Sequence, residues 1–234
     1  MAATPSGPTA TQLLTGLPLL AGLSEHALAE LAAVTRVDYF APEATIFTQG
    51  DPSDRFWILR GGRLKIVLLA DSGREAILEV ISPGEVFGGT ALFMAAHPAT
   101  ARAMTAAETI SFPGEAYARL IEQHPQIAQR LVRMLGARLF SLLSLQVLAG
   151  ERVERRLAHI LLKLADLAGR AESDGAILIT LPLTRQDLAE MAGTTLETAI
   201  RTMSRFRAQG WVETRRGGYI LIHEPAQLRA QAGV

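Results

Sequence analysis

The stretch TRQDLAEMAGTTLETAIRTMSRF, residues 184–206, predicts two short helices joined by a tight turn. Thr184 is a suitable N-cap for the first helix, and Asp187 also lies where it can satisfy unpaired amides at the helix start. Gly193 stands where the chain has to turn sharply, and Thr195 can cap the second helix. This pattern is typical of a helix-turn-helix, which indicates binding to DNA.

The second helix has two unlike faces. Helical spacing turns four residues toward the protein: Ala199, Thr202, Met203 and Phe206. The other face then carries Leu196, Glu197, Ile200, Arg201 and Arg205. A helix of this kind can pack on its own domain and still present side chains to DNA.

The outward face has the chemistry of a base reader. Arg201 can donate to O6 and N7 of guanine, while Glu197, one turn earlier, accepts from N4 of the paired cytosine. The aliphatic Leu196 and Ile200 suit contact with a thymine methyl group. Glu197 and Arg201 could instead form an ordinary i,i+4 ion pair, worth only about 0.2–0.5 kcal/mol on a solvated helix.

The segment that follows, WVETRRGGYILI at residues 211–222, favours the DNA reading. Residues 211–214 and 219–222 alternate as two strands around an Arg-Arg-Gly-Gly turn. Such a hairpin is the wing of a winged helix-turn-helix, and its Arg215 and Arg216 can reach phosphates.

The extended segment TRQDLAEMAGTTLETAIRTMSRFRAQGWV resembles the CRP/FNR family of bacterial transcription regulators. The resemblance implies that Glu197 and Arg201 read a G·C pair in the major groove, and that Thr184 and Arg185 contact phosphate. Leu196 stands where the catabolite-activator branch has an arginine, so the full half-site preference of that branch does not carry over. An apolar residue at 196 is more similar to the FNR-like branch, although that branch has a serine where this chain has Ile200. We assign phosphate contacts to six residues: Thr184, Arg185, Thr195, Arg205, Arg215 and Arg216.

Short apolar segments broken by glycines fill residues 37–112, a rhythm that predicts an all-β roll. The segments IFTQGDPSDRFWILRGGRLKI, ISPGEVFGGTALF and ATARAMTAAE resemble the jelly-roll sensor domain of the same family. The resemblance covers residues 17–222. The resulting fold class is α+β, with an N-terminal jelly-roll sensor, a long dimerisation helix and a C-terminal winged helix-turn-helix.

The sensor departs from the family's cyclic-nucleotide chemistry at two positions. Gly89 stands where the resemblance implies a glutamate for the ribose, and His97 or Pro98 stands where it implies an arginine for the cyclic phosphate. Burying a phosphate without a matched cation is costly, so we do not expect cAMP binding. The candidate effector pocket comprises Gly88, Gly89, Thr90, His97, Arg102 and Ser141, and it either holds another anion or is a tightly packed turn.

The chain contains no cysteine, which excludes thiolate zinc sites and the iron–sulfur cluster of the FNR branch. Haem is an alternative cofactor because some relatives sense gases with it. The five histidines show no ligand spacing, and only His97 lies beside the expected cavity. The sequence therefore leaves the effector unknown.

The segment PQIAQRLVRMLGARLFSLLSLQVLA, residues 125–149, predicts a long helix that starts at proline. A 4,3,4,3 spacing of residues forms a heptad seam: Ala128, Val132, Leu135, Leu139, Leu142, Gln146 and Ala149. Ile127, Leu131 and Met134 add a second apolar flank. The helix is either intramolecular core or, as the resemblance implies, a homodimer interface centred on Val132, Leu135, Leu139 and Leu142.

Composition sets the remaining expectations. The 23 basic and 23 acidic residues cancel, so attraction to DNA must come from local patterning. The chain shows neither an apolar leader nor a span of about 20 apolar residues, which predicts a cytoplasmic protein. The expected domains are a flexible tail (1–16), the sensor roll (17–120), the dimerisation helix (121–149), the winged helix-turn-helix (150–223) and a C-terminal tail (224–234).

Together these features predict a homodimeric transcription regulator on a palindromic operator, with any small effector that switches it being other than cAMP. The resemblance implies RNA polymerase as a partner and an activator as the regulator type, although the sequence leaves the direction of control open. A nucleotide- or haem-gas-sensing regulator is the alternative. A cupin-like enzyme would need clustered metal ligands, which the roll lacks, so we expect no enzyme.

Overall fold

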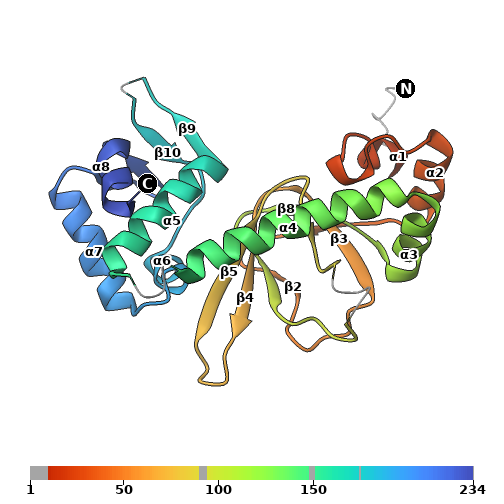
Figure 1. The fold of residues 1–234 in the computed structure, drawn as a ribbon, viewed down its shortest axis with the longest axis horizontal. Helices are drawn as coiled ribbons and strands as arrows, with labels where there is room; N and C mark the ends of the chain where they lie inside the picture. Colours follow the sequence, from red (N-terminus) through yellow and green to blue (C-terminus); the bar gives the residue numbers. More distant parts are fainter. Residues whose placement is uncertain (1–9, 90–93, 148–150, 174, 234) are drawn as a thin grey trace, which may run out of the picture. The chain divides into compact units, whose positions relative to one another are not determined.

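The computed structural model describes residues 10–89, 94–147, 151–173 and 175–233, with side chains omitted for 140–147. The chain divides into two units (Figure 1). The first comprises the described residues up to Leu64 together with Ile81–Arg138, and the second comprises Lys65–Val80 with Leu139–Val234. No helix among the described residues is long and apolar enough to cross a membrane.

Short strands separated by glycine turns dominate the first half of the chain, as the sequence predicts. They are β1 (Arg36–Phe40), β2 (Thr45–Phe47), β3 (Arg55–Gly61), β4 (Leu64–Leu69), β5 (Glu75–Ile81), β6 (Val86–Phe87), β7 (Thr100–Ala103) and β8 (Ala107–Pro113). Two four-stranded sheets have the orders β1-β8-β3-β6 and β2-β7-β4-β5. Gly62 turns the chain from β3 into β4 at φ +81°, and a Cβ there would collide with the Ala106 carbonyl oxygen.

Helices flank these strands. They are α1 (Ala10–Leu14), the 3-10 turn η1 (Pro18–Leu20), α2 (Glu25–Ala33), α3 (Gly114–Gln123) and α4 (Pro125–Val147). Ser24 caps α2 by accepting from the Ala27 amide at 3.2 Å.

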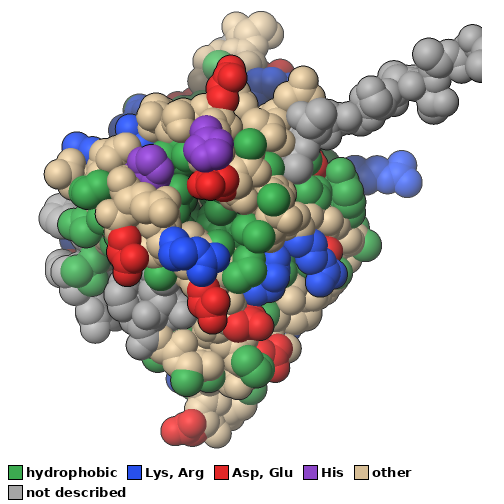
Figure 2. Space-filling model, turned by 90° about the vertical axis from the view of Figure 1, so that its right-hand side faces the viewer, with side chains coloured by type: hydrophobic (Ala, Val, Ile, Leu, Met, Phe, Trp, Pro, Cys, Tyr) green, Lys and Arg blue, Asp and Glu red, His purple; other side chains and the backbone are tan. Residues whose placement is uncertain are grey.

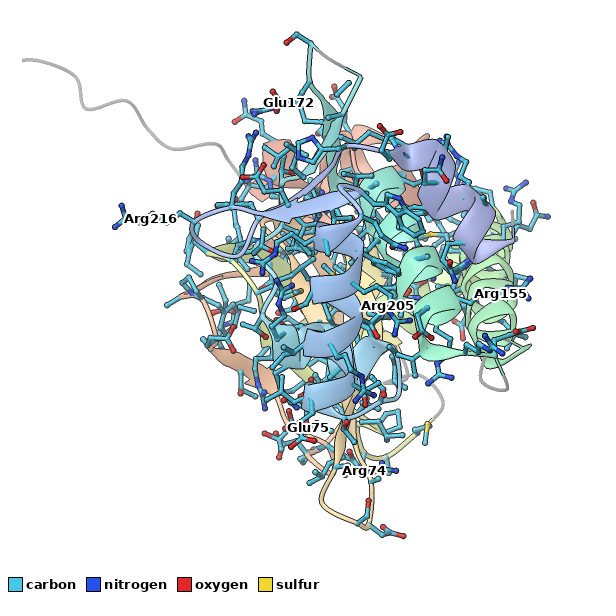
Figure 3. The ribbon with its side chains drawn as sticks, turned by 90° about the vertical axis from the view of Figure 1, so that its left-hand side faces the viewer. Arg74, Glu75, Arg155, Glu172, Arg205 and Arg216 are labelled. Atoms are coloured by element: carbon cyan, nitrogen blue, oxygen red, sulfur yellow. The ribbon has the colours of Figure 1, made fainter. Side chains whose placement is uncertain are left out.

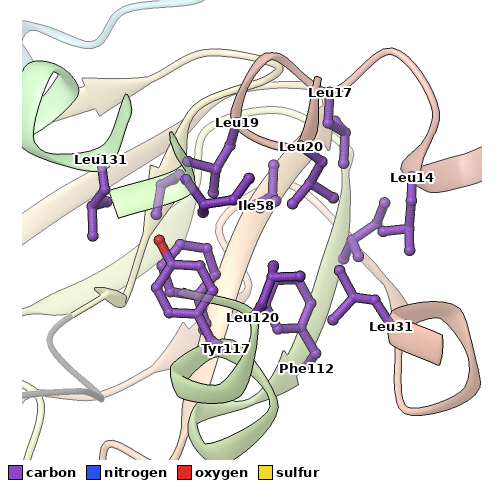
Figure 4. Packing of buried hydrophobic residues seen from close by; sticks show 14 of the residues in the cluster. Leu14, Leu17, Leu19, Leu20, Leu31, Ile58, Phe112, Tyr117, Leu120 and Leu131 are labelled. Carbon is purple, nitrogen blue, oxygen red and sulfur yellow. The ribbon is translucent and has the colours of Figure 1, made fainter. Parts of the chain in front are cut away.

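The core of the first unit lies between β3, β8 and these helices (Figure 4). The Phe56 ring stacks on Tyr117 of α3 with centroids 3.7 Å apart, and Phe112 lies 5.3 Å from Phe56. Burial raises the pKa of the Tyr117 hydroxyl far above its ordinary value, because no water is available to stabilise a phenolate there.

Both tails expected from the sequence are shorter than we predicted. Leu14 of α1 is 1% exposed and belongs to the core, so the flexible segment cannot extend to residue 16. At the other end Pro225–Ala232 forms helix α8, with Leu228 fully buried. At the N-terminal end, apolar burial overrides the Ala-, Thr-, Pro- and Gly-rich composition that suggested disorder.

The second unit contains the predicted winged helix-turn-helix. Its helices are α5 (Val153–Ala168), α6 (Arg185–Met191), α7 (Leu196–Ala208) and α8. Its sheet has the order β11-β12-β10-β9, formed by β9 (Gly169–Ala171), β10 (Ile177–Ile179), β11 (Val212–Thr214) and β12 (Ile220–Ile222). The α+β class, with an N-terminal β-sheet sensor and a C-terminal helix-turn-helix, is thereby confirmed.

Candidate nucleic-acid interface and sensor pocket

Reciprocal caps hold the start of α6. The Thr184 hydroxyl accepts from the Asp187 amide at 3.0 Å, and the Asp187 carboxylate accepts from the Thr184 amide at 2.9 Å. Gly193 takes φ +56° in the turn, and Thr195 caps α7 by accepting from the Thr198 amide at 3.3 Å. These contacts confirm both predicted caps and the turn.

A buried ion pair joins Asp187 to Lys65 within the second unit. The Lys65 Nζ donates to Asp187 Oδ1 at 2.6 Å, and the two residues are 6% and 5% exposed. Burial disfavours the charged carboxylate, but hydrogen bonds from Lys65 and Thr184 outweigh that effect and hold the Asp187 pKa below its ordinary value. Sequence reasoning missed this pair, because 122 positions separate its members.

Helix α7 buries one face and exposes the other. The inward residues are at most 3% exposed: Ala199, Thr202, Met203 and Phe206. Leu196 and Ile200 are 42% and 43% exposed, and Glu197 and Arg201 are also exposed. The structure describes the side chains of Glu197 and Arg201, and no ion pair joins them. The inward and outward faces are therefore those predicted, and the i,i+4 pair is not formed.

The arginines proposed for phosphates differ in their surroundings. Arg185 is partly buried and donates to the Thr214 hydroxyl of β11 at 2.6 Å. Burial, and then repulsion from Arg207, lowers the Arg185 pKa. Arg205 has an intramolecular partner, because its guanidinium lies 2.7 Å from the Glu154 carboxylate of α5 (Figure 3).

The wing has the expected hairpin. Strands β11 and β12 pair antiparallel, and Arg215 and Arg216 lie exposed in the turn between them. Figure 3 shows Arg216 at the outer end of this turn. Gly218 takes φ +84°, and a Cβ there would lie 2.9 Å from the Leu183 carbonyl oxygen, so a larger residue would displace the turn.

In the sensor, three of the predicted pocket residues are close together. A Cβ on Gly88 would lie 3.5 Å from His97, and Gly89 adjoins it in sequence. Arg102 of β7 pairs with Thr45 of β2. By strand alternation its side chain faces away from the buried Ala101 and Ala103. Thr90 lies outside the described residues, as does the side chain of Ser141.

Aromatic rings surround His97. Its ring stacks on Phe47 with centroids 3.7 Å apart, and Phe47 lies 6.2 Å from Trp57. His97 is 4% exposed, and burial lowers its pKa despite the opposing charges of Asp51 and Asp54. His97 is consequently neutral at neutral pH. Within the described ranges no three His, Cys, Asp or Glu side chains cluster as metal ligands.

Helix α4 has two apolar flanks. Ile127 and Leu131 are 0% and 6% exposed in the core of the first unit. Val132, Leu135 and Leu139 of the heptad seam are 67%, 45% and 58% exposed. Leu142 belongs to the part of the helix whose side chains are not described. The exposed leucines leave the seam without an intramolecular cover at these positions.

Two family models match the chain. The cyclic nucleotide-binding domain matches residues 37–124, and the Crp-like helix-turn-helix domain matches residues 155–231. The second range includes α8, in agreement with its burial.

Full-length relatives match as well. The CRP-like cAMP-activated global transcriptional regulator of Mycobacterium tuberculosis is 30% identical over 94% of this chain and 99% of its own length. The transcriptional activator protein Anr of Pseudomonas protegens is 29% identical over 80% of this chain and 77% of its own length. A CRP-family regulator from Thermus thermophilus has a TM-score of 0.73 at 24% identity, over 84% of this chain and 97% of that one, which supports the fold.

The Lys65–Asp187 pair generates a stability prediction. The lowered Asp187 pKa contributes stability that is complete above the ordinary aspartate pKa and is lost as pH falls through the lowered value. Lys65→Met should cost about 3–5 kcal/mol at neutral pH, because it leaves a buried carboxylate without its cation. It should also shift the acid loss of stability to higher pH, because the Asp187 pKa rises.

Urea unfolding of the second unit at several pH values measures both effects. Arg170→Met is the control, since Arg170 forms an exposed pair with Glu172 and its loss should cost at most about 1 kcal/mol. Equal costs for the two variants, with unchanged acid profiles, would refute the role of the buried pair.

Proposed function

We propose, since the chain belongs to the CRP/FNR family of transcription regulators, that it binds an inverted-repeat operator as a homodimer and reads each half-site with α7. The observation that carries this proposal is the division of α7 into a buried and an uncovered face. Leu196, Glu197, Ile200 and Arg201 all lie on the uncovered face, so they are free to approach base edges.

The dimer part of the proposal rests on α4. Val132, Leu135 and Leu139 are large apolar side chains in heptad register, and a partner helix would remove them from water. A two-fold dimer places two α7 helices about one DNA turn apart, which matches a palindromic operator. This geometry favours the interface over the alternative of an intramolecular core helix.

Local rather than global charge directs this regulator to DNA. Figure 2 shows acidic, basic and apolar side chains interspersed over the face that it displays. That mixture agrees with a formal net charge of zero. In this proposal Arg185 of α6 and Arg215 and Arg216 of the wing supply the attraction to phosphates. RNA polymerase as a partner and a cytoplasmic location follow from the same family resemblance.

We further propose that the effector is a small molecule other than cAMP. A Cβ at Gly89 would lie 3.3 Å from Phe56 and 3.6 Å from Val86, so the position of the family's ribose-binding glutamate is crowded and apolar. His97 replaces the phosphate-binding arginine, and burial disfavours the protonated ring that would balance a cyclic phosphate. The relative that is cAMP-activated therefore does not set the effector of this chain.

The base-reading proposal predicts the effect of Arg201→Ala. Loss of the guanine contact should cost about 1–3 kcal/mol per half-site on the cognate operator and much less on random DNA. Glu197→Ala should relax the preference at the same base pair. Binding-site selection from random duplexes checks both, with Arg205→Ala as the control that keeps the motif. An unchanged motif and specificity ratio for Arg201→Ala would withdraw the role.

The dimer proposal predicts the behaviour of a Leu135→Glu, Leu139→Glu double variant. Two unpaired carboxylates in the seam should disrupt the dimer, because their burial is strongly unfavourable, and operator affinity should fall with it. Ala137→Glu, outside the seam on the same helix, should leave the dimer intact. Sedimentation measures the assembly, and a wild-type monomer at micromolar concentration that still bound palindromic DNA tightly would contradict the proposal.

The effector proposal predicts no tight binding of cAMP or cGMP. Calorimetry should give dissociation constants weaker than about 1 mM, or roughly −4 kcal/mol. The Mycobacterium tuberculosis relative, measured alongside, is the positive control. Saturable micromolar cAMP binding with a matching rise in operator affinity would show that other groups replace the missing glutamate and arginine.

A further inference from the structure

We infer that Arg185 and Arg207 together form a clamp for one phosphodiester of the DNA backbone, at the junction of α6, the end of α7 and the wing. The inference deepens the proposed function and rests on it. Arg207 is not among the residues that the sequence pattern assigned to DNA, and its role follows from where the fold places it.

Helical spacing puts Arg207 on the DNA-facing side of α7. It follows Ile200 by seven residues, so it lies on the same face two turns later, about 10 Å along the axis. Arg207 is exposed, and Ile200 is 43% exposed. The residue thus extends the uncovered face beyond the base-reading positions, toward the flanking backbone.

Arg185 is held in place from the other side. Its guanidinium donates to the Thr214 hydroxyl at 2.6 Å, which ties the start of α6 to strand β11 of the wing. The group is partly buried, so it is less hydrated than an ordinary surface arginine. A preorganised guanidinium of this kind loses little freedom when it binds an anion.

Among the described residues, no acidic side chain neutralises this pair of cations. Asp187, the carboxylate nearest to Arg185 in the sequence, binds Lys65 at 2.6 Å, and Glu213 of β11 lies 3.3 Å from His223. The Arg207 side chain forms neither a hydrogen bond nor an ion pair with the part of the chain that the structure describes. Burial lowers the Arg185 pKa, and repulsion from the Arg207 guanidinium on the adjoining helix lowers it further.

Two interacting guanidinium groups without a counterion are unfavourable in the free protein, and a bridging anion relieves the repulsion. Guanidinium groups match phosphate oxygens through paired, charge-assisted hydrogen bonds. The DNA backbone supplies such an anion beside the groove that α7 enters. Arg207 also lies in the last turn of α7, where any cation interacts favourably with the helix dipole, so the test must separate that effect from DNA binding.

The experiment measures affinity of the full-length protein for a selected operator and for a random duplex over a range of salt concentrations. Arg207→Ala should weaken both duplexes by the same factor and reduce the slope of log K against log salt by about 0.9 per subunit. Arg185→Ala should do the same, because the clamp neutralises the phosphate only when both guanidinium groups bridge it. The double variant should therefore lose no more slope than either single variant. Arg207→Lys should retain the slope.

Arg170→Ala is the control, since Arg170 of β9 has no assigned contact with DNA and forms an exposed pair with Glu172. It should change neither affinity nor slope. A second measurement replaces single backbone phosphates of the operator with neutral methylphosphonates. One replacement per half-site should weaken the wild type and leave Arg207→Ala unaffected.

Four results would overturn the clamp. They are an unchanged slope in Arg207→Ala, slope losses that add in the double variant, a loss confined to one DNA sequence, and a loss equalled by Arg170→Ala. An Arg207→Ala variant with lowered stability and normal DNA binding would show that Arg207 only stabilises the end of α7 through the helix dipole. Failure of the wild type to bind any duplex would instead refute the proposed function, so the two failures are distinguishable.

Discussion

The burial of one face of α7 is the constraint on which the DNA-binding unit depends. Met203 and Phe206 are 2% and 1% exposed, and burying side chains of this size contributes about 1.5–3 kcal/mol each. The Phe206 ring also packs against Trp211, with centroids 5.4 Å apart, at the start of the wing. Because this face is fixed, the opposite face has a fixed direction, and Glu197 and Arg201 are presented without further adjustment.

Asp187 fixes the position of α6, as the buried face fixes that of α7. Its carboxylate accepts from the Thr184 amide and hydroxyl and from Lys65, so one buried charge both caps the helix and binds a strand residue. Such a group is costly to bury and strongly destabilising to leave unpaired. The arrangement therefore specifies a single position for α6 against Lys65, and α6 in turn carries Arg185 to its contact with Thr214.

Local chemistry explains which features the sequence could predict. The caps at Thr184 and Thr195 and the turn at Gly193 depend on neighbours within three residues, and period-3.6 patterning identified the buried face of α7. Contacts between distant residues were not predictable. Three such interactions depend on tertiary packing: the Lys65–Asp187 pair, the Arg205–Glu154 pair and the effect of the Arg207 charge on Arg185. The burial of Leu14 and Leu228 was missed because it depends on packing against distant parts of the fold.

The orientation of α7 in the DNA groove can be measured directly because the chain contains no cysteine. A single Ser204→Cys substitution on the exposed face would carry an iron chelate that cleaves nearby DNA, with Arg170→Cys on β9 as the control site. On a selected operator, the chelate at position 204 should cut in two clusters about 10 base pairs apart, one per half-site. The control should cut weakly or not at all. Equal cleavage from both positions, or cleavage from position 170 alone, would contradict a reading role for α7.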